Sequence, residues 1–403
     1  MHRSLVSCLA AAALAAGFLT ALPTAASAAP GPGEPVLDIA HSLPTGGMNL
    51  WRLPIAAENP TLGQPMLQAT LEAGGFRYDR SRTATGDFGN VTGVDDGSPD
   101  QLISHGQPNG GVLLWVVGGG PDATPRLWAD LRGGGWSWES SRQLVGDADG
   151  DGYDDVISVH RTDAPTGPAA NVWVHRGTGA GFQDPALWAV VPRTVGPSMP
   201  SDFLPGEPFV DVRYTVADLN GDGFDDLVAT HRGSRRPLAG IAMYYAPWIN
   251  TGAGFVARAG AGPAPASQGW SYDASRDVAA DTNGDGTDEL FTIHQQPGDG
   301  ILVWERWGEA LNVHDLRSDL RTGGWSYSGS RQVAADVSGD GIDELVSIHD
   351  QVGGGLLVWA HGFQRRGNLG ALPSDLSVIA DLRGGGWDFR ASRESVGVAN
   401  GTR

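Results

Sequence analysis

The chain has 403 residues and carries 46 acidic against 27 basic residues, which gives a formal net charge of −19. Nucleic acid and anionic membranes attract basic patches, so this composition argues against both as main partners. The single cysteine, Cys8, leaves the rest of the chain without disulfide bonds, so its stability has to come from core burial or bound metal.

The N-terminal residues have the pattern of a secretion signal. Arg3 precedes an apolar run from Leu5 to Leu22, and Ala26-Ser27-Ala28 is a small-x-small cleavage site. We therefore predict a signal peptide over residues 1–28, a secreted, extracellular protein, and one mature domain over residues 29–403 with no membrane span. An uncleaved membrane anchor is the alternative, which the alanine-rich run and the processing signal disfavour.

The rest of the chain is an internal repeat. Ser141-Arg142 leads into VGDADGDGYDDVISVH, and similar segments follow Arg213, Ser275-Arg276 and Ser330-Arg331, with a looser copy after Ser81-Arg82. Each full copy has an upstream aromatic pattern such as Trp136-Ser137-Trp138 and a downstream strand that contains Trp. Short β-branched runs bounded by Gly, Asp and Pro predict strands and hairpins, and no amphipathic helix is evident.

The two chain ends together make one more repeat. Residues 387–400 reproduce the first half of a copy and stop, while residues 36–51 match the second half. An open solenoid has whole or capped terminal repeats, whereas a ring closes by pairing its two ends. We predict an all-β propeller closed in this way. Histidines at the ends of the second strands give six blades (His41, His105, His160, His231, His294 and His349), and a seventh could be hidden in residues 185–212.

Four acidic loops have the residues that calcium needs. Calcium takes six to eight hard oxygens, and these loops offer closely spaced carboxylates, amides, hydroxyls and one backbone carbonyl. A strand follows the carboxylate at position nine directly, which excludes the helical EF-hand. We predict about four Ca²⁺ ions, held by Asp147, Asp149, Asp151, Tyr153 and Asp155; by Asp218, Asn220, Asp222, Phe224 and Asp226; by Asp281, Asn283, Asp285, Thr287 and Glu289; and by Asp336, Ser338, Asp340, Ile342 and Glu344.

Two further loops match less well. The loop from Asp87 to Asp100 keeps its acidic residues but is lengthened, so its metal binding stays open. Val398 replaces the first ligand in the closing blade, where we expect no ion. An acidic, Gly-rich turn without metal is the alternative for any one copy, and four copies with the same spacing make it less favourable.

The Asp-x-Asn-Gly-Asp-Gly-x-x-Asp loop and its flanking strands resemble the FG-GAP or VCBS repeat proteins, over nearly all of residues 34–403. That family includes integrin heads and some lectins, so the resemblance implies a propeller fold and calcium binding. It does not imply one partner, because the same ring serves adhesion, sugar binding and accessory domains of enzymes.

Two kinds of residue could contact a partner. The arginines and histidines that recur in every blade either bind sugar hydroxyls beside stacking Trp rings or form the same internal hydrogen bonds in each blade; we favour the internal role. A second, irregular cluster of basic and aromatic residues could form a contact surface, with loop drift as the equal alternative. It comprises Arg232, Arg235, Arg236, Tyr244, Tyr245 and Trp248.

No local catalytic motif is present: we find no nucleophile elbow, HExxH helix or phosphate-cradling loop. The favoured function is a non-enzymatic binding or adhesion module for extracellular carbohydrate, with a protein–protein adhesion scaffold as the runner-up. A polysaccharide hydrolase or lyase that uses the propeller mouth is the third hypothesis, because its residues would come from separate blades and leave no local motif.

Overall fold

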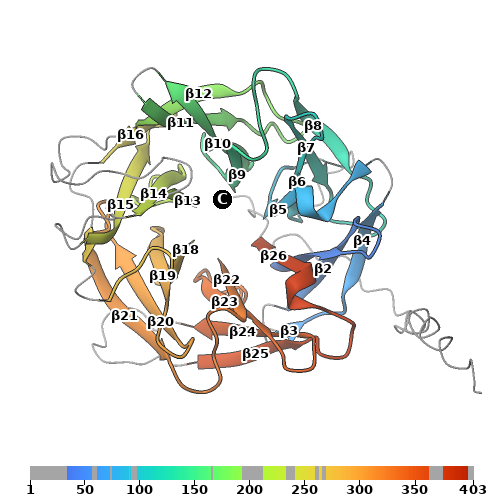
Figure 1. The fold of residues 1–403 in the computed structure, drawn as a ribbon, viewed down its shortest axis with the longest axis vertical. Coiled ribbons are helices and arrows are strands. Elements are labelled where there is room, and N and C mark those ends of the chain that lie inside the picture. The colour runs from blue at the N-terminus through green and yellow to red at the C-terminus, as the bar shows by residue number, and fades with distance from the viewer. Residues whose placement is uncertain are drawn as a thin grey trace, which may run out of the picture.

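The protein is a ring of six antiparallel β-sheets, with the first strand of each sheet innermost (Figure 1). The structure is a computed structural model, and it describes residues 34–56, 61–72, 75–89, 91, 98–164, 167–192, 212–232, 241–258, 263–265, 269–362 and 375–397. The six-bladed propeller predicted from the repeat is confirmed. The predicted signal peptide and residues 193–211 lie outside the described residues.

Each sheet is one blade, which we number in chain order from the first complete one. Blade I contains β5 (Ser81–Gly86), β6 (Asp100–Gly106), β7 (Val112–Val117) and β8 (Arg126–Leu131). Blade II contains β9 (Ser141–Gly146), β10 (Asp155–Ala164), β11 (Gly167–His175) and β12 (Ala186–Pro192). Blade III contains β13 (Val212–Ala217), β14 (Asp226–Arg232), β15 (Ile241–Asn250), β16 (Phe255–Ala257) and β17 (Pro263–Pro265).

The other three blades complete the ring. Blade IV contains β18 (Ser275–Ala280), β19 (Glu289–Gln295), β20 (Ile301–Trp307) and β21 (Val313–Leu320). Blade V contains β22 (Ser330–Ala335), β23 (Glu344–Asp350), β24 (Leu356–Gly362) and β25 (Asp375–Asp381). Blade VI contains β26 (Ser392–Gly397), β1 (Val36–Ser42), β2 (Met48–Ala56), β3 (Thr61–Leu62) and β4 (Met66–Leu71).

Blade VI closes the ring as the chain ends predict. Strand β26, from the C-terminal part of the chain, pairs antiparallel with β1 in a register that runs from Val36 opposite Gly397 to His41 opposite Ser392. The innermost strand of this blade therefore comes from one end of the chain and the remaining strands from the other. Among the described residues, the structure contains no helix long and apolar enough to span a membrane.

The core lies between neighbouring blades. Consecutive residues of the second strands are buried, so each sheet offers apolar side chains on both faces. Between blades V and VI, for example, Leu37 and Ile39 pack in one cluster with Val346 and Ile348. In five blades a β-bulge occurs at the Trp of the third strand, as between Val358 and Trp359. The bulge redirects the chain beside a ring that is only half buried.

The seam between blades VI and I also contains a buried ion pair. Asp38 accepts from both Arg52 Nε at 2.8 Å and Arg52 Nη2 at 2.7 Å, and neither side chain is exposed. The hydroxyl of Thr85, on the innermost strand of blade I, donates to Asp38 at 3.0 Å. Gln101, which is paired with Thr85, is also fully buried. The seam between blades VI and I thus carries a polar contact as well as an apolar one.

We expect Arg52→Met to destabilise the fold by about 3–5 kcal/mol, because it leaves the Asp38 carboxylate buried without its partner. Chemical denaturation of the purified protein measures this. Arg77→Met is the matched control, since Arg77 pairs with Asp79 on the surface and such a pair contributes at most about 1 kcal/mol. Equal losses in the two variants would contradict a role for the buried pair.

Candidate functional sites

The antiparallel order of the strands separates two chemically different faces. The acidic loops join the first strand to the second strand of each blade, so they all lie on one side, which we call the loop face. The starts of the first strands, with their Ser-Arg pairs, lie on the opposite side, which we call the arginine face. Figure 1 shows these first strands around the centre of the ring. Each face therefore repeats its own set of side chains around the ring.

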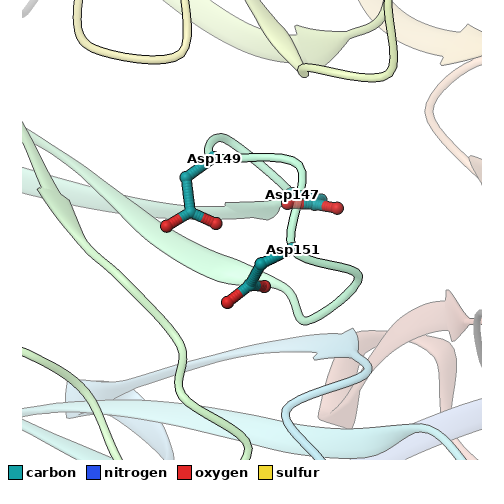
Figure 2. A group of neighbouring side chains, drawn as sticks. All are labelled: Asp147, Asp149 and Asp151. Carbon is teal, nitrogen blue, oxygen red and sulfur yellow. The ribbon is translucent and has the colours of Figure 1, made fainter.

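The loop of blade II gathers carboxylates in the way a cation needs. Asp147, Asp149 and Asp151 each place a carboxylate oxygen within 4.8 Å of the others (Figure 2). Oδ1 of Asp149 is buried and has no hydrogen-bond partner. An oxygen that is desolvated and unpaired costs free energy unless something binds it. The donor set and this orphaned atom both fit a calcium ion, and the carbonyl of Tyr153 and the carboxylate of Asp155 belong to the same loop.

The first aspartate of each loop also builds the turn. Asp147 accepts from Gly150 N at 2.7 Å and from Gly152 N at 3.0 Å. Asp218, Asp281 and Asp336 accept in the same way from the glycine amides three and five residues further on. Gly152 has a φ of 91°, which favours glycine. The spacing recognised in the sequence therefore corresponds to one loop conformation in all four blades.

In blade II, the carboxylate at position nine is held by one backbone amide of its own loop and one from the turn after the third strand of the blade. Asp155 accepts from Ala148 N at 3.1 Å and from Gly177 N at 2.7 Å. Burial raises the pKa of Asp155 to about 8 and those of Asp226 and Glu344 to about 7. A cation would favour the ionised form of each group and so offset the cost of burial.

In the other three loops the same donors are close together but are hydrogen-bonded to one another. Asn220 Nδ2 donates to Asp222, Asn283 Nδ2 donates to Glu289, and Ser338 Oγ donates to Asp336. Each loop keeps the predicted oxygens at the same positions, so its donor set fits calcium once the amide or hydroxyl turns its oxygen inward. Part of the lengthened loop of blade I, and Val398 in the closing blade, lie outside the described residues.

On the opposite face, five of the six repeated arginines join their blade to the next. Arg276 donates to Ser330 O at 2.7 Å and to Tyr327 O at 2.8 Å, and its guanidinium lies 4.2 Å from the centre of the Tyr327 ring. Arg82, Arg213, Arg331 and Arg393 make the same stacked, hydrogen-bonded contact with the following blade. This geometry supports the internal role that we favoured for the arginines.

Two of the repeated histidines, His294 and His349, are hydrogen-bonded to the aromatic turn of their own blade. His294 Nε2 accepts from Ser271 N at 3.0 Å and His349 Nε2 accepts from Ser326 N at 3.1 Å. Their rings meet Trp270 and Trp325 edge to face. These histidines therefore fix the turn that carries the Trp, and their nitrogens are not directed at a ligand.

The irregular cluster predicted as a contact surface is largely core, which corrects that prediction. Tyr244, Tyr245 and Trp248 are 4%, 0% and 8% exposed. Tyr245 bonds the Thr292 hydroxyl at 2.8 Å and lies under the guanidinium of Arg306. Arg232 pairs with Asp273 in the next blade, and Arg235 and Arg236 lie outside the described residues. The error arose because β15 is a buried third strand, whose aromatic residues fill the spaces between blades.

The structure reveals a repeated surface feature that the motif search missed. Asp130 and Arg132 form an exposed, fork-like ion pair at the end of an outer strand, just before a Gly-rich turn and Trp136. The same ion pair occurs in two further copies. The arginine side chain is 58% exposed in the first pair and 56% and 57% exposed in the two copies. They are Asp319, Arg321 and Trp325, and Asp381, Arg383 and Trp387. The identical spacing Asp-Leu-Arg-x-Gly-Gly-Trp was the available signal.

Each of these turns brings a second indole ring beside the first. The ring centres of Trp136 and Trp173 are 6.1 Å apart, and those of Trp325 and Trp359 are 5.4 Å apart. All four rings are only half buried. In the third copy, Trp387 lies 5.5 Å from Trp51, although Trp387 itself is buried. We call each ion pair with its two indoles a fork site.

The fold resembles that of known lectins. A lectin of Agrocybe aegerita, described as recognising non-reducing terminal N-acetylglucosamine, has a TM-score of 0.52 at 16% identity, with 91% of this chain and 96% of that chain covered. The lectin BP39L of Burkholderia pseudomallei has a TM-score of 0.47 at 11% identity, with 88% and 83% covered. The six-bladed Aleuria aurantia lectin has a TM-score of 0.45 at 11% identity, with 87% and 96% covered.

The fold is shared with lectin propellers. At these sequence identities the similarity shows a shared fold and not a shared ligand. We draw no conclusion from the two matches with TM-scores below 0.5. No protein-family model and no curated protein matches the chain. The resemblance of the repeats to FG-GAP or VCBS proteins therefore stays a prediction.

We expect Arg276→Met to destabilise the fold by about 2–3 kcal/mol, because two hydrogen bonds from a charged donor and a cation–π contact are lost between blades IV and V. Thermal and denaturant unfolding measure the change. Arg383→Met removes an exposed arginine paired only across its own turn, so it should cost under about 1 kcal/mol. A negligible effect of Arg276→Met would show that the repeated arginines do not hold the blades together.

Proposed function

We propose that the protein is a secreted, calcium-stabilised carbohydrate-binding propeller that presents three similar glycan sites on its arginine face. The observation that carries this proposal is the threefold recurrence of the fork site. Binding sites repeated around a rigid ring suit a repetitive ligand, because linked contacts raise the overall affinity above that of any one site.

The chemistry of a fork site suits a sugar. A saccharide ring has an apolar face of C–H groups, which a half-exposed indole can cover, and a rim of hydroxyls, which need both donors and acceptors. The paired carboxylate and guanidinium offer acceptors and donors within one rigid fork. The turn that carries the indole needs glycine for its backbone: Gly323 has a φ of 87°, where a side chain would be strained.

Carbohydrate is favoured over a protein partner. A protein interface of standard size buries a contiguous patch of about 800 Å² on each partner, rich in apolar residues at its centre. The fork sites are instead separate, charged and built around a few indoles. The lectin of Agrocybe aegerita, which covers most of this chain in fold, is consistent with the same assignment.

Glycan-array screening of the purified domain, followed by titration calorimetry on the strongest hit, tests the proposal. We expect enrichment on a limited set of glycans, and at least tenfold weaker binding when Arg132, Arg321 and Arg383 are all replaced by alanine. The matched control is Arg77→Ala, which removes another exposed arginine paired with an aspartate two residues away.

The two possible failures differ in meaning. No enrichment on any glycan would reject carbohydrate binding as a whole. Binding that survives the triple replacement would keep the lectin function but reject the fork sites. Circular dichroism of each variant checks that the propeller remains folded.

The calcium component has its own test. Extracellular calcium modules bind with dissociation constants of roughly 10⁻⁴–10⁻³ M, so four loops at about 1 mM calcium would add on the order of 2–6 kcal/mol. We expect the unfolding midpoint to rise by several degrees from EDTA to millimolar calcium, with about four ions bound per chain. Asp149→Ala should lower the count by one, whereas Asp130→Ala, outside the loops, should not change it. An unchanged midpoint with no bound ion would identify the loops as ordinary acidic turns.

A further inference from the structure

We infer that the calcium loops are coupled in series around the ring, so that an ion in one blade favours an ion in the next. This inference rests on the proposed calcium loops and concerns a residue that none of the predicted ligand sets includes. That residue is the aspartate at position eight, just before the position-nine ligand: Asp154, Asp225, Asp288 and Asp343.

Each position-eight aspartate binds the backbone of the first ligand in the neighbouring loop. Asp288 donates its backbone N–H to Asp218 O at 2.6 Å, and its carboxylate accepts from Asp218 N at 2.8 Å. Asp343 makes the same two hydrogen bonds with Asp281, at 2.9 and 3.1 Å. We call such a reciprocal pair an aspartate joint.

The joints recur through the four loops. The N–H of Asp225 bonds Asp147 O at 2.9 Å, and the backbone of Asp147 hydrogen-bonds the Asp225 carboxylate. Three joints therefore connect the loops of blades II, III, IV and V into one chain. A fourth joint, between Asp154 and Asp87, leads from blade II back to the lengthened loop of blade I.

Each joint connects predicted ligands of two different ions. On one side it fixes the backbone of the first ligand of a loop, such as Asp218. On the other side it lies between the position-seven carbonyl of Thr287 and the position-nine carboxylate of Glu289, both in the next loop. An ion that orders one loop must also order the residue that binds the neighbouring first ligand, so part of the ordering cost of the second ion has already been met.

Side chains at the joints are fitted closely between blades. A Cβ placed on Gly146, just before Asp147, would lie 2.4 Å from Oδ2 of Asp225. Gly86 stands in the same relation to Asp154, at 2.6 Å. At these two joints the glycine leaves room for the carboxylate of the next blade, whereas Ala217 and Ala280 stand at the same position in the other two joints. In blade I, position eight is Pro99, which has neither a carboxylate nor an N–H and cannot form a joint with blade VI.

The test is the calcium-binding isotherm of the whole domain, measured by competition with a chromophoric chelator and by calorimetry. We expect the parent protein to bind calcium more steeply than four independent sites. Asp288→Ala cuts the series into two pairs of loops without removing a predicted ligand. It should lower the Hill coefficient and weaken the later binding steps on the order of tenfold, with about four ions still bound at saturation.

Asp154→Ala is the matched control. It makes the same chemical change at an aspartate joint, but one that leads to the lengthened loop, so the series of four remains intact and the Hill coefficient should stay at the parent value. Asp288→Asn keeps an acceptor oxygen and should retain most of the cooperativity. If Asp288→Ala does not fold, Asp288→Asn is the variant whose isotherm is compared with that of the parent protein.

Several results would overturn the inference. Parent binding that fits four independent sites would reject the coupling while leaving the calcium loops in place, as would equal Hill coefficients for Asp288→Ala and Asp154→Ala. Absence of any calcium binding would reject the proposed loops and the coupling together. Glycan binding is not part of this readout, so its outcome leaves the test unaffected.

Discussion

The whole molecule depends on the main-chain pairing between β1 and β26. A propeller blade exposes apolar faces on both sides, so a blade at an open end would leave one face in water. Pairing the last strand of the chain with the first removes that end, and the fully buried Asp38–Arg52 pair joins β1 to β2 in the same blade. An ion pair contributes less to net stability than an apolar contact of the same size, but breaking it is costly. It therefore penalises a misaligned closure more strongly than it stabilises the correct one.

Once the ring is closed, neighbouring blades are held together by two different devices, one on each face. On the arginine face, a guanidinium reaches across to the carbonyl groups and an aromatic ring of the following blade. On the loop face, an aspartate reaches back to the backbone of the preceding loop. The arginine contact is complete without a ligand. The loop contact carries uncompensated negative charge, and burial raises the pKa of Asp154 to about 7. Only the loop face therefore gains by binding cations, which separates metal binding from the opposite face.

The closed ring could be predicted from the sequence, because the internal repeat and the half-repeats at the two chain ends can be read from it directly. The six repeated histidines predicted six blades, and the half-repeats at the two chain ends predicted that the ring closes by pairing them. The acidic loops were equally visible, since their ligands are local and regularly spaced. Tyr244, Tyr245 and Trp248 were misplaced because exposure depends on which strand of a blade they occupy, and that order is set by pairing across blade III. The position-eight aspartates belong to the repeated motif, but their hydrogen-bond partners are far away in the sequence. Asp218 and Asp288, for example, are 70 residues apart. A local motif cannot reveal a contact that only ring geometry creates.

The two faces also differ in how their repeated sites should communicate. Fork sites are separate turns on the surface, each with its own ion pair and indoles, and among the described residues no hydrogen bond connects one fork site to another. Independent sites on a rigid frame give avidity toward a repetitive glycan without any change in shape. The calcium loops share backbone contacts through the aspartate joints, so their occupancies cannot be independent if the joints tighten on binding. A fall in calcium would then loosen several blades together, whereas the loss of one sugar contact would leave the others unchanged. The cooperative metal binding and independent sugar binding that we propose would both follow from the same ring, according to whether a repeated side chain contacts the neighbouring blade.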